Sequence, residues 1–140
     1  MRKIITTHLG LAILISGLLG ACTPEQIASN EARAKAVLVQ INAGLKVSVA
    51  AAKDAVDAVC ENQIAAANAA AVVRAGLSTQ FGLKTTQNLN NLDTALATMS
   101  AACAQASANP NDPAMKSLLK SAMAAYQVVK AAQAKTGASS

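Results

Sequence analysis

The sequence predicts an all-α protein, an alanine-rich bundle of three or four helices in up-and-down order with a long first helix, behind a cleaved leader. Alanine has the highest helix propensity and supplies 32 of the 119 residues from Cys22 onward. The chain has one phenylalanine, one tyrosine and no tryptophan, whereas strands need aromatic and β-branched residues. Apolar residues also recur every three or four positions, which is the period of a helix with one buried face.

The first 21 residues have the organisation of a secretory signal peptide. Arg2 and Lys3 form a basic start, an apolar stretch follows over residues 4–19, and small residues end the segment. The strongest apolar run, residues 11–19, is shorter than the ~20 residues that span a bilayer. Cleavage is therefore favoured over a retained membrane-spanning anchor.

The end of this leader, Leu19-Gly20-Ala21-Cys22, resembles the lipobox of bacterial lipoproteins. The resemblance covers residues 1–22 only. It implies that Cys22 receives a diacylglycerol on its thiol, that the leader is cut before it, and that its amino group is acylated, typically with palmitate. Thr23-Pro24, in place of an aspartate after the cysteine, implies transfer to the outer membrane, facing the periplasm. The alternative is ordinary secretion with cleavage after Ala21.

Residues 25–75 read as one long helix, or as two helices that meet near Asn42-Ala43-Gly44, because proline is absent and glycine is rare there. If the chain folds back at Gly44, residues 25–43 add a fourth member to the bundle; otherwise they form a protruding stalk. Two glycines predict a turn over residues 76–84. The expected inward positions are Val37, Leu38, Ile41, Leu45, Val49, Ala52, Val56, Cys60, Ile64, Ala67 and Ala71.

A second helix is expected over about residues 85–107, and a third from Asp112 to about Lys135. Asp112 would be the N-cap of the third helix and Pro113 its first residue, where a missing N–H costs nothing. Gly137 would end it. The expected inward residues are Leu89, Leu92, Leu96, Met99 and Cys103 in the second helix and Met115, Leu118, Leu119, Ala122, Tyr126 and Val129 in the third.

The chain is long enough for one small domain. The predicted organisation is a signal peptide over residues 1–21, a lipidated N-terminus over 22–24, a helical bundle over 25–136 and a disordered tail over 137–140.

Cys60 and Cys103 are the remaining cysteines once Cys22 is lipidated, and outside the cytoplasm such a pair favours a disulfide. Residues equidistant from the turn of an antiparallel hairpin face each other, and the midpoint of these two cysteines falls inside the predicted turn. The same register sets Ile64 opposite Met99, Ala67 opposite Leu96 and Ala71 opposite Leu92. The alternative is two buried, reduced cysteines.

Charge and composition exclude several classes of function. The formal charge of +5 includes Arg2 and Lys3 of the leader, so the mature chain has ten basic and seven acidic side chains, without the arginine clusters or stacking aromatics of a nucleic-acid site. The one histidine, His8, lies in the leader, which argues against histidine-based catalysis and histidine metal ligands. Asp54, Asp57 and Glu61 share a helix face and are interpreted as a solvated stripe. No catalytic residue, metal, cofactor or small-molecule substrate is expected.

The third helix carries four lysines and no acid after Asp112, so it is a basic amphipathic helix. Its lysines could contact an anionic lipid surface, although a solvated bundle face is the simpler interpretation. We therefore expect a membrane-anchored envelope lipoprotein with a structural or protein-interaction role, bound to the membrane by its lipid and open to an envelope protein partner. The alternative is a membrane-acting lysis or phage-exclusion lipoprotein that uses the third helix. The four lysines that could contact an anionic surface are Lys116, Lys120, Lys130 and Lys135.

Overall fold

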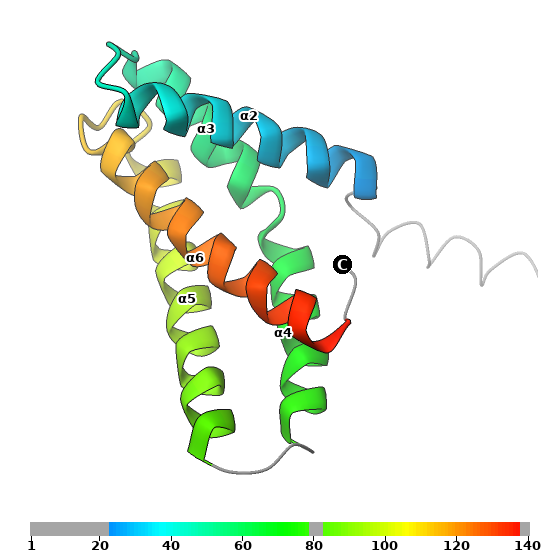
Figure 1. Cartoon of the computed structure of the whole chain (residues 1–140). Helices are drawn as coiled ribbons and strands as arrows, with labels where there is room; N and C mark the ends of the chain where they lie inside the picture. Colours follow the sequence, from blue (N-terminus) through cyan, green and yellow to red (C-terminus); the bar gives the residue numbers. More distant parts are fainter. Residues whose placement is uncertain (1–22, 79–82, 138–140) are drawn as a thin grey trace, which may run out of the picture.

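A computed structural model describes residues 23–78 and 83–137, and its regular elements there are all helices, as expected (Figure 1). The leader with Cys22, the centre of the predicted turn and the last three residues lie outside the described residues. The helices are α2 (Pro24–Asn42), α3 (Val49–Cys60), α4 (Gln63–Ser78), α5 (Leu83–Ala108) and α6 (Met115–Thr136).

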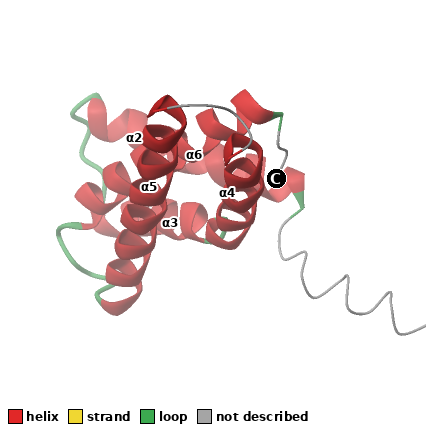
Figure 2. Ribbon diagram, turned by 90° about the horizontal axis from the view of Figure 1, so that it is seen from below, coloured by secondary structure: helices red, strands yellow, loops and turns green. Residues whose placement is uncertain are grey.

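The helices pack as a bundle around α6, which contacts all four of the others (Figures 1 and 2). α2 folds back on α3, α4 follows α3 after two residues, and α5 returns along α4 and α6. Residues 24–42 are therefore part of the bundle and do not form a stalk. The long first helix is not one helix, because three helices occupy the segment in which one or two were expected.

Both ends of α2 are set by local hydrogen bonds. Thr23 and Gln26 form a capping box, in which each side chain accepts a hydrogen bond from the other's backbone N–H at 3.2 Å. At the other end Gly44 is left-handed, with φ 76°, and Leu45 N–H donates to the carbonyl of Gln40 at 3.0 Å. This Schellman ending confirms the predicted break near residues 42–44. Leu45, expected to be inward, lies in the exposed linker after it.

A second break, between α3 and α4, was not predicted. Asn62 is 1% exposed and its Nδ2 donates to the carbonyl of Ala58 at 3.1 Å, while its backbone N–H donates to Val59. A side chain that competes with the backbone in this way bends a helix.

The position of Asn62 also shows why the predicted inward face of α4 is wrong. The buried stripe runs from Val59 through Asn62, whereas the prediction followed Cys60 to Ile64. Ile64 is 67% exposed, and Ala67 and Ala71 are exposed as well. These three therefore do not lie opposite Met99, Leu96 and Leu92. The buried residues of α4 are Ala66, Ala69, Ala70, Val73 and Leu77.

The core is built mainly from small residues with a few large ones between them. The largest apolar side chains that are almost fully buried are Leu92, Met99, Met115, Leu119 and Met123. Leu89, Leu96 and Leu118 are partly buried against this core, so the expected inward faces of the second and third helices are correct. Alanine removes little apolar area from water, so each helix contact of this core is weak.

The third predicted helix begins later than expected. α6 starts at Met115, with Ala114 as an N-cap that makes no side-chain bond, so Asp112 is not its N-cap and Pro113 precedes the helix. Asp112 instead accepts a hydrogen bond from Ala114 N–H at 2.8 Å, which holds a turn before the helix. At the other end Gly137 is left-handed, with φ 68°, as predicted.

Candidate functional site

The predicted cysteine pair is bonded in the structure. Cys60, at the end of α3, and Cys103, in α5, form a disulfide with a Cα–Cα distance of 5.7 Å. The bond closes the segment that contains all of α4 and most of α5. The sequence predicted that the bond joins two consecutive helices of one hairpin. The structure has the same bond, but it joins α3 to α5, and α4 lies between these two helices in the chain.

The four lysines of α6 do not form one free surface. Lys130 is paired with Glu31 of α2 at 3.2 Å, and its ammonium lies 5.8 Å from the centre of the Tyr126 ring. Lys116 is partly buried and Lys120 is exposed, both in the first two turns of α6, while Lys135 lies in its last turn. The apolar face between them is inside the bundle, where Met115, Leu119 and Tyr126 are buried.

Glu31 pairs with lysines of two different helices. Its side chain is 11% exposed and accepts from Lys35 of its own helix at 2.6 Å as well as from Lys130. Burial alone would raise the pKa of Glu31, but hydrogen bonds and charges from the two lysines outweigh it, so the pKa lies below 4.5. Burial of Tyr126 and the nearby charge of Glu31 raise the pKa of that phenol above 10. The cluster fastens α2 to α6.

Of the three carboxylates expected to form a solvated stripe, two lie in α3 and Glu61 is its C-cap. Asp54 is exposed, Asp57 pairs with Lys53 one turn before it, and Glu61 accepts from Asn30 of α2 at 2.9 Å. In the described part of the chain, no group of three or more histidine, cysteine, aspartate or glutamate residues could hold a metal ion.

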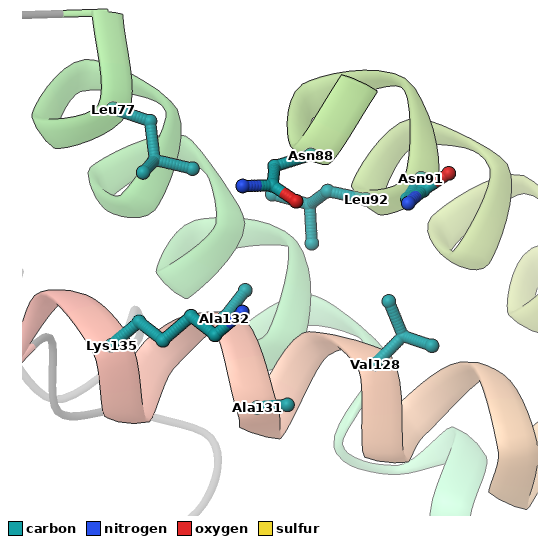
Figure 3. Close-up of a pocket in the computed structure, with 8 residues that line it drawn as sticks. All are labelled: Leu77, Asn88, Asn91, Leu92, Val128, Ala131, Ala132 and Lys135. Carbon is teal, nitrogen blue, oxygen red and sulfur yellow. The ribbon is translucent and has the colours of Figure 1, made fainter. Parts of the chain in front are cut away.

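An apolar pocket of about 200 Å³ opens where α4, α5 and α6 meet (Figure 3). Leu77, Leu92 and Val128 reach toward its centre from the three helices, and Ala131 and Ala132 form the α6 side. Asn88, Asn91 and Lys135 stand at its rim, so the pocket combines an apolar floor with amide groups and one ammonium. It can take a small apolar group that carries a hydrogen-bonding or anionic end.

The pocket continues as a shallow groove between α5 and α6. A second hollow, of about 480 Å³, shares Asn91 and Val128 with the pocket. The two hollows together form what we call the α5–α6 groove, and Lys135 is the one charged residue among its described lining residues. The second hollow is lined by Asn91, Thr94, Ala95, Thr98, Ser121, Ala124, Ala125 and Val128.

Neither the pocket nor the groove was found from the sequence. The available signal was the spacing of Asn88, Asn91, Thr94 and Thr98, which repeats every three or four residues on a helix with Asp93 as its one acid. That pattern marks a neutral polar face, and it does not distinguish an open helix surface from a groove.

Comparisons with known proteins place the chain in no family: no family model, curated protein or solved structure matches it. Among the helices of residues 23–78 and 83–137, none has the length and apolar character needed to cross a bilayer.

Proposed function

We propose that this chain is a lipid-anchored protein of the bacterial cell envelope, attached through Cys22 and serving a structural or protein-interaction role. The observation that carries the proposal is the sequence Leu19-Gly20-Ala21-Cys22 at the end of a signal-type leader. Thr23-Pro24 favours the outer membrane, with the bundle on the periplasmic side. Two or three acyl chains hold a protein firmly, because each buried CH₂ contributes about 0.8 kcal/mol.

Two features of the bundle support this proposal. A disulfide between Cys60 and Cys103 is stable in an oxidising compartment such as the periplasm and is rare in the cytosol. The bundle also begins directly after the anchor, since Thr23 already caps α2. The proposal includes no catalytic activity, because the chain after Cys22 has no histidine for a serine–histidine or cysteine–histidine nucleophile system.

The alternative, a membrane-acting lipoprotein that inserts α6, would require α6 to leave the bundle. Its apolar residues, among them Met115, Leu119 and Val129, are 0% exposed and would have to be withdrawn from the other helices. We therefore favour the anchored bundle. Under that proposal, the purified protein added to dye-loaded vesicles leaves them intact; leakage would support the alternative.

The proposal is tested by intact mass and fractionation of the full-length chain made in a Gram-negative host. We expect loss of residues 1–21, added acyl mass and the mass deficit of one disulfide. Cys22→Ser should move the protein from the membrane to the soluble fraction, whereas Cys60→Ser with Cys103→Ser, a control for the loss of thiols, should leave it on the membrane. An unacylated protein, or one that still carries Met1, contradicts the proposal.

A further inference from the structure

The tether between the proposed anchor and the bundle is one residue long. Thr23 is the N-cap of α2 and Pro24 is its first residue. Consecutive Cα atoms are ~3.8 Å apart, so the first turn of α2 begins within ~8 Å of Cys22. If Cys22 holds acyl chains in a membrane, the side of the bundle at which α2 begins must lie against that membrane.

The beginning of α2 lies on the same side of the bundle as α4. In Figures 1 and 2 the start of α2, the end of α6 and α4 all lie toward the right of the molecule. Two contacts fix this arrangement: Asn30 donates to Glu61, two residues before α4, at 2.9 Å, and Glu31 pairs with Lys130 of α6. The chain just before α4 therefore lies beside the second turn of α2.

The side of α4 that faces away from α5 and α6 is uncharged and, apart from Asn68, apolar. Ile64 is 67% exposed and Val72 is 60% exposed, which makes them two of the most exposed large apolar side chains in the described residues. Arg74 is the one ionisable residue of α4, and it pairs with Asp93 of α5. We call this surface the outer face of α4; it consists of Ile64, Ala67, Asn68, Ala71 and Val72.

The position of the outer face distinguishes it from Val39 and Leu45, the two other large apolar side chains of the described residues that are more than half exposed. Val39 is 66% exposed but lies in the last turn of α2, about 22 Å along the helix from its start. Leu45 lies beyond that end, in the linker to α3. A contiguous apolar face without charge marks a contact with lipid or protein, whereas single exposed residues need no explanation.

We propose that the outer face of α4 rests on the surface of the membrane that holds Cys22, and that this contact orients the bundle. The inference rests on the lipid anchor proposed above. The acyl chains supply the attachment, and the face of α4 selects which side of the bundle meets the lipid. Ile64 and Val72 lie at the level of the boundary between headgroups and acyl chains.

Tryptophan fluorescence tests this orientation cleanly, because the chain has no tryptophan of its own. Four single variants, Ile64→Trp, Val72→Trp, Val39→Trp and Leu45→Trp, are purified as the lipidated protein. Each is reconstituted into phosphatidylcholine vesicles with and without bromine on the acyl chains near the headgroup. All four positions are exposed, so the substitutions avoid the core.

We expect Ile64→Trp and Val72→Trp in vesicles to emit at shorter wavelength than the same variants that also carry Cys22→Ser and stay in solution. Bromine on the acyl chains should quench about half of their emission, because a side chain at the headgroup boundary lies at a depth of ~5–10 Å. Val39→Trp and Leu45→Trp should show neither change. If all four remain accessible to water, the inference is overturned. A blue shift of Ile64→Trp without bromine quenching also overturns it, because protein then covers the face, as in contact with a second copy.

The same samples separate the two proposals. Flotation with the vesicles and the acyl mass report the anchor, whereas bromine quenching reports the orientation. Protein that floats but is not quenched leaves the anchor standing and overturns the inference. Protein that carries no acyl chain and does not float overturns both.

Discussion

The two helical hairpins of this bundle, α2–α3 and α4–α5, are held together by different means. The first is rich in charge, with nine ionisable side chains from Glu25 to Glu61; the second has three in the fifty residues from Asn62 to Asn111. In α2–α3, side chains of Thr23 and Ser48 cap both helices, and ion pairs lie within the helices. These are local interactions, each of which involves residues three or four positions apart.

Asn30–Glu61 and Glu31–Lys130 add long-range contacts to α2–α3, whereas α4–α5 has an ion pair between its helices and the disulfide. Arg74 and Asp93 form an exposed ion pair between its helices, which contributes little because water screens it. Its buried face is made largely of alanine, and the Cys60–Cys103 bond closes the segment around it. A weakly interacting hairpin with few charges can thus be kept in place by one covalent bond, which leaves its surface poor in the charges that would oppose contact with lipid or protein.

Reduction of the disulfide is expected to have the largest effect and to fall mainly on α4–α5. The cysteines are separated by 43 residues, for which the chain-entropy model gives a loss of about 4 kcal/mol in the free energy of unfolding. Urea unfolding of the purified protein, oxidised and reduced, measures this loss. Amide hydrogen exchange should rise more in α4 and α5 than in α2.

Cys60→Ala with Cys103→Ala is the matched control, because it removes the bond without reductant. Its unfolding midpoint should lie close to that of the reduced protein. Equal midpoints for oxidised and reduced wild-type protein would show that packing alone holds the second hairpin, and the contrast between the hairpins would disappear.

Removal of a cap should have a smaller effect, located in the first hairpin. Ser48 accepts a hydrogen bond from Ala51 N–H at 3.1 Å, so Ser48→Ala should lower the free energy of unfolding by about 1 kcal/mol. Ser100→Ala on the exposed side of α5 is the control and should change it by less than ~0.5 kcal/mol, because that serine lies inside a helix. Urea midpoints that fall equally in both variants would contradict a role of local caps in the first hairpin.

Filling the pocket should have a still smaller effect, in the stabilising direction. Asn88 lies at the rim of the pocket near Leu77 and Leu92, so Asn88→Leu should cover apolar floor and stabilise the protein by about 0.5–1 kcal/mol. Asn90→Leu brings the same gain in helix propensity on an exposed position outside the pocket. The difference between the thermal midpoints of the two variants measures the stabilisation that comes from covering the pocket floor. Equal midpoints would show that Asn88→Leu covers no more apolar surface than Asn90→Leu does, and would contradict the prediction.

The local features of the sequence predicted much of this fold. The helical class follows from alanine, the break after Asn42 from Gly44, and the end of α6 from Gly137. The start of α6 was missed because Asp112 caps a turn and not the helix. The second break was missed because its cause is tertiary: Asn62 was not identified as a break signal, and its effect comes from being buried with a bond to the carbonyl of Ala58.

The candidate site was predicted only where one residue type determines the chemistry. After Cys22 the sequence has two cysteines and therefore one possible pair, so the prediction of Cys60–Cys103 was correct. The pocket depends on how α4, α5 and α6 approach one another, and small residues such as Ala131 fit a buried or an exposed face equally well. For the same reason the predicted inward face of α4 was wrong: an alanine-rich helix has little periodic signal to orient it.

The smallest expected effect is a pH dependence located between α2 and α6. The pKa of Glu31 lies below its unfolded value of 4.5, so its ionised form stabilises the folded state above pH 4.5, and that contribution is lost as the pH falls through the folded pKa. Glu31→Gln and Lys130→Gln should therefore unfold at lower urea concentration at neutral pH and lose less stability on acidification than the wild type. Lys120→Gln, an exposed change on the same helix, should keep the wild-type slope. If Lys120→Gln flattens the slope as much as Lys130→Gln, net charge and not the α2–α6 cluster sets the acid response.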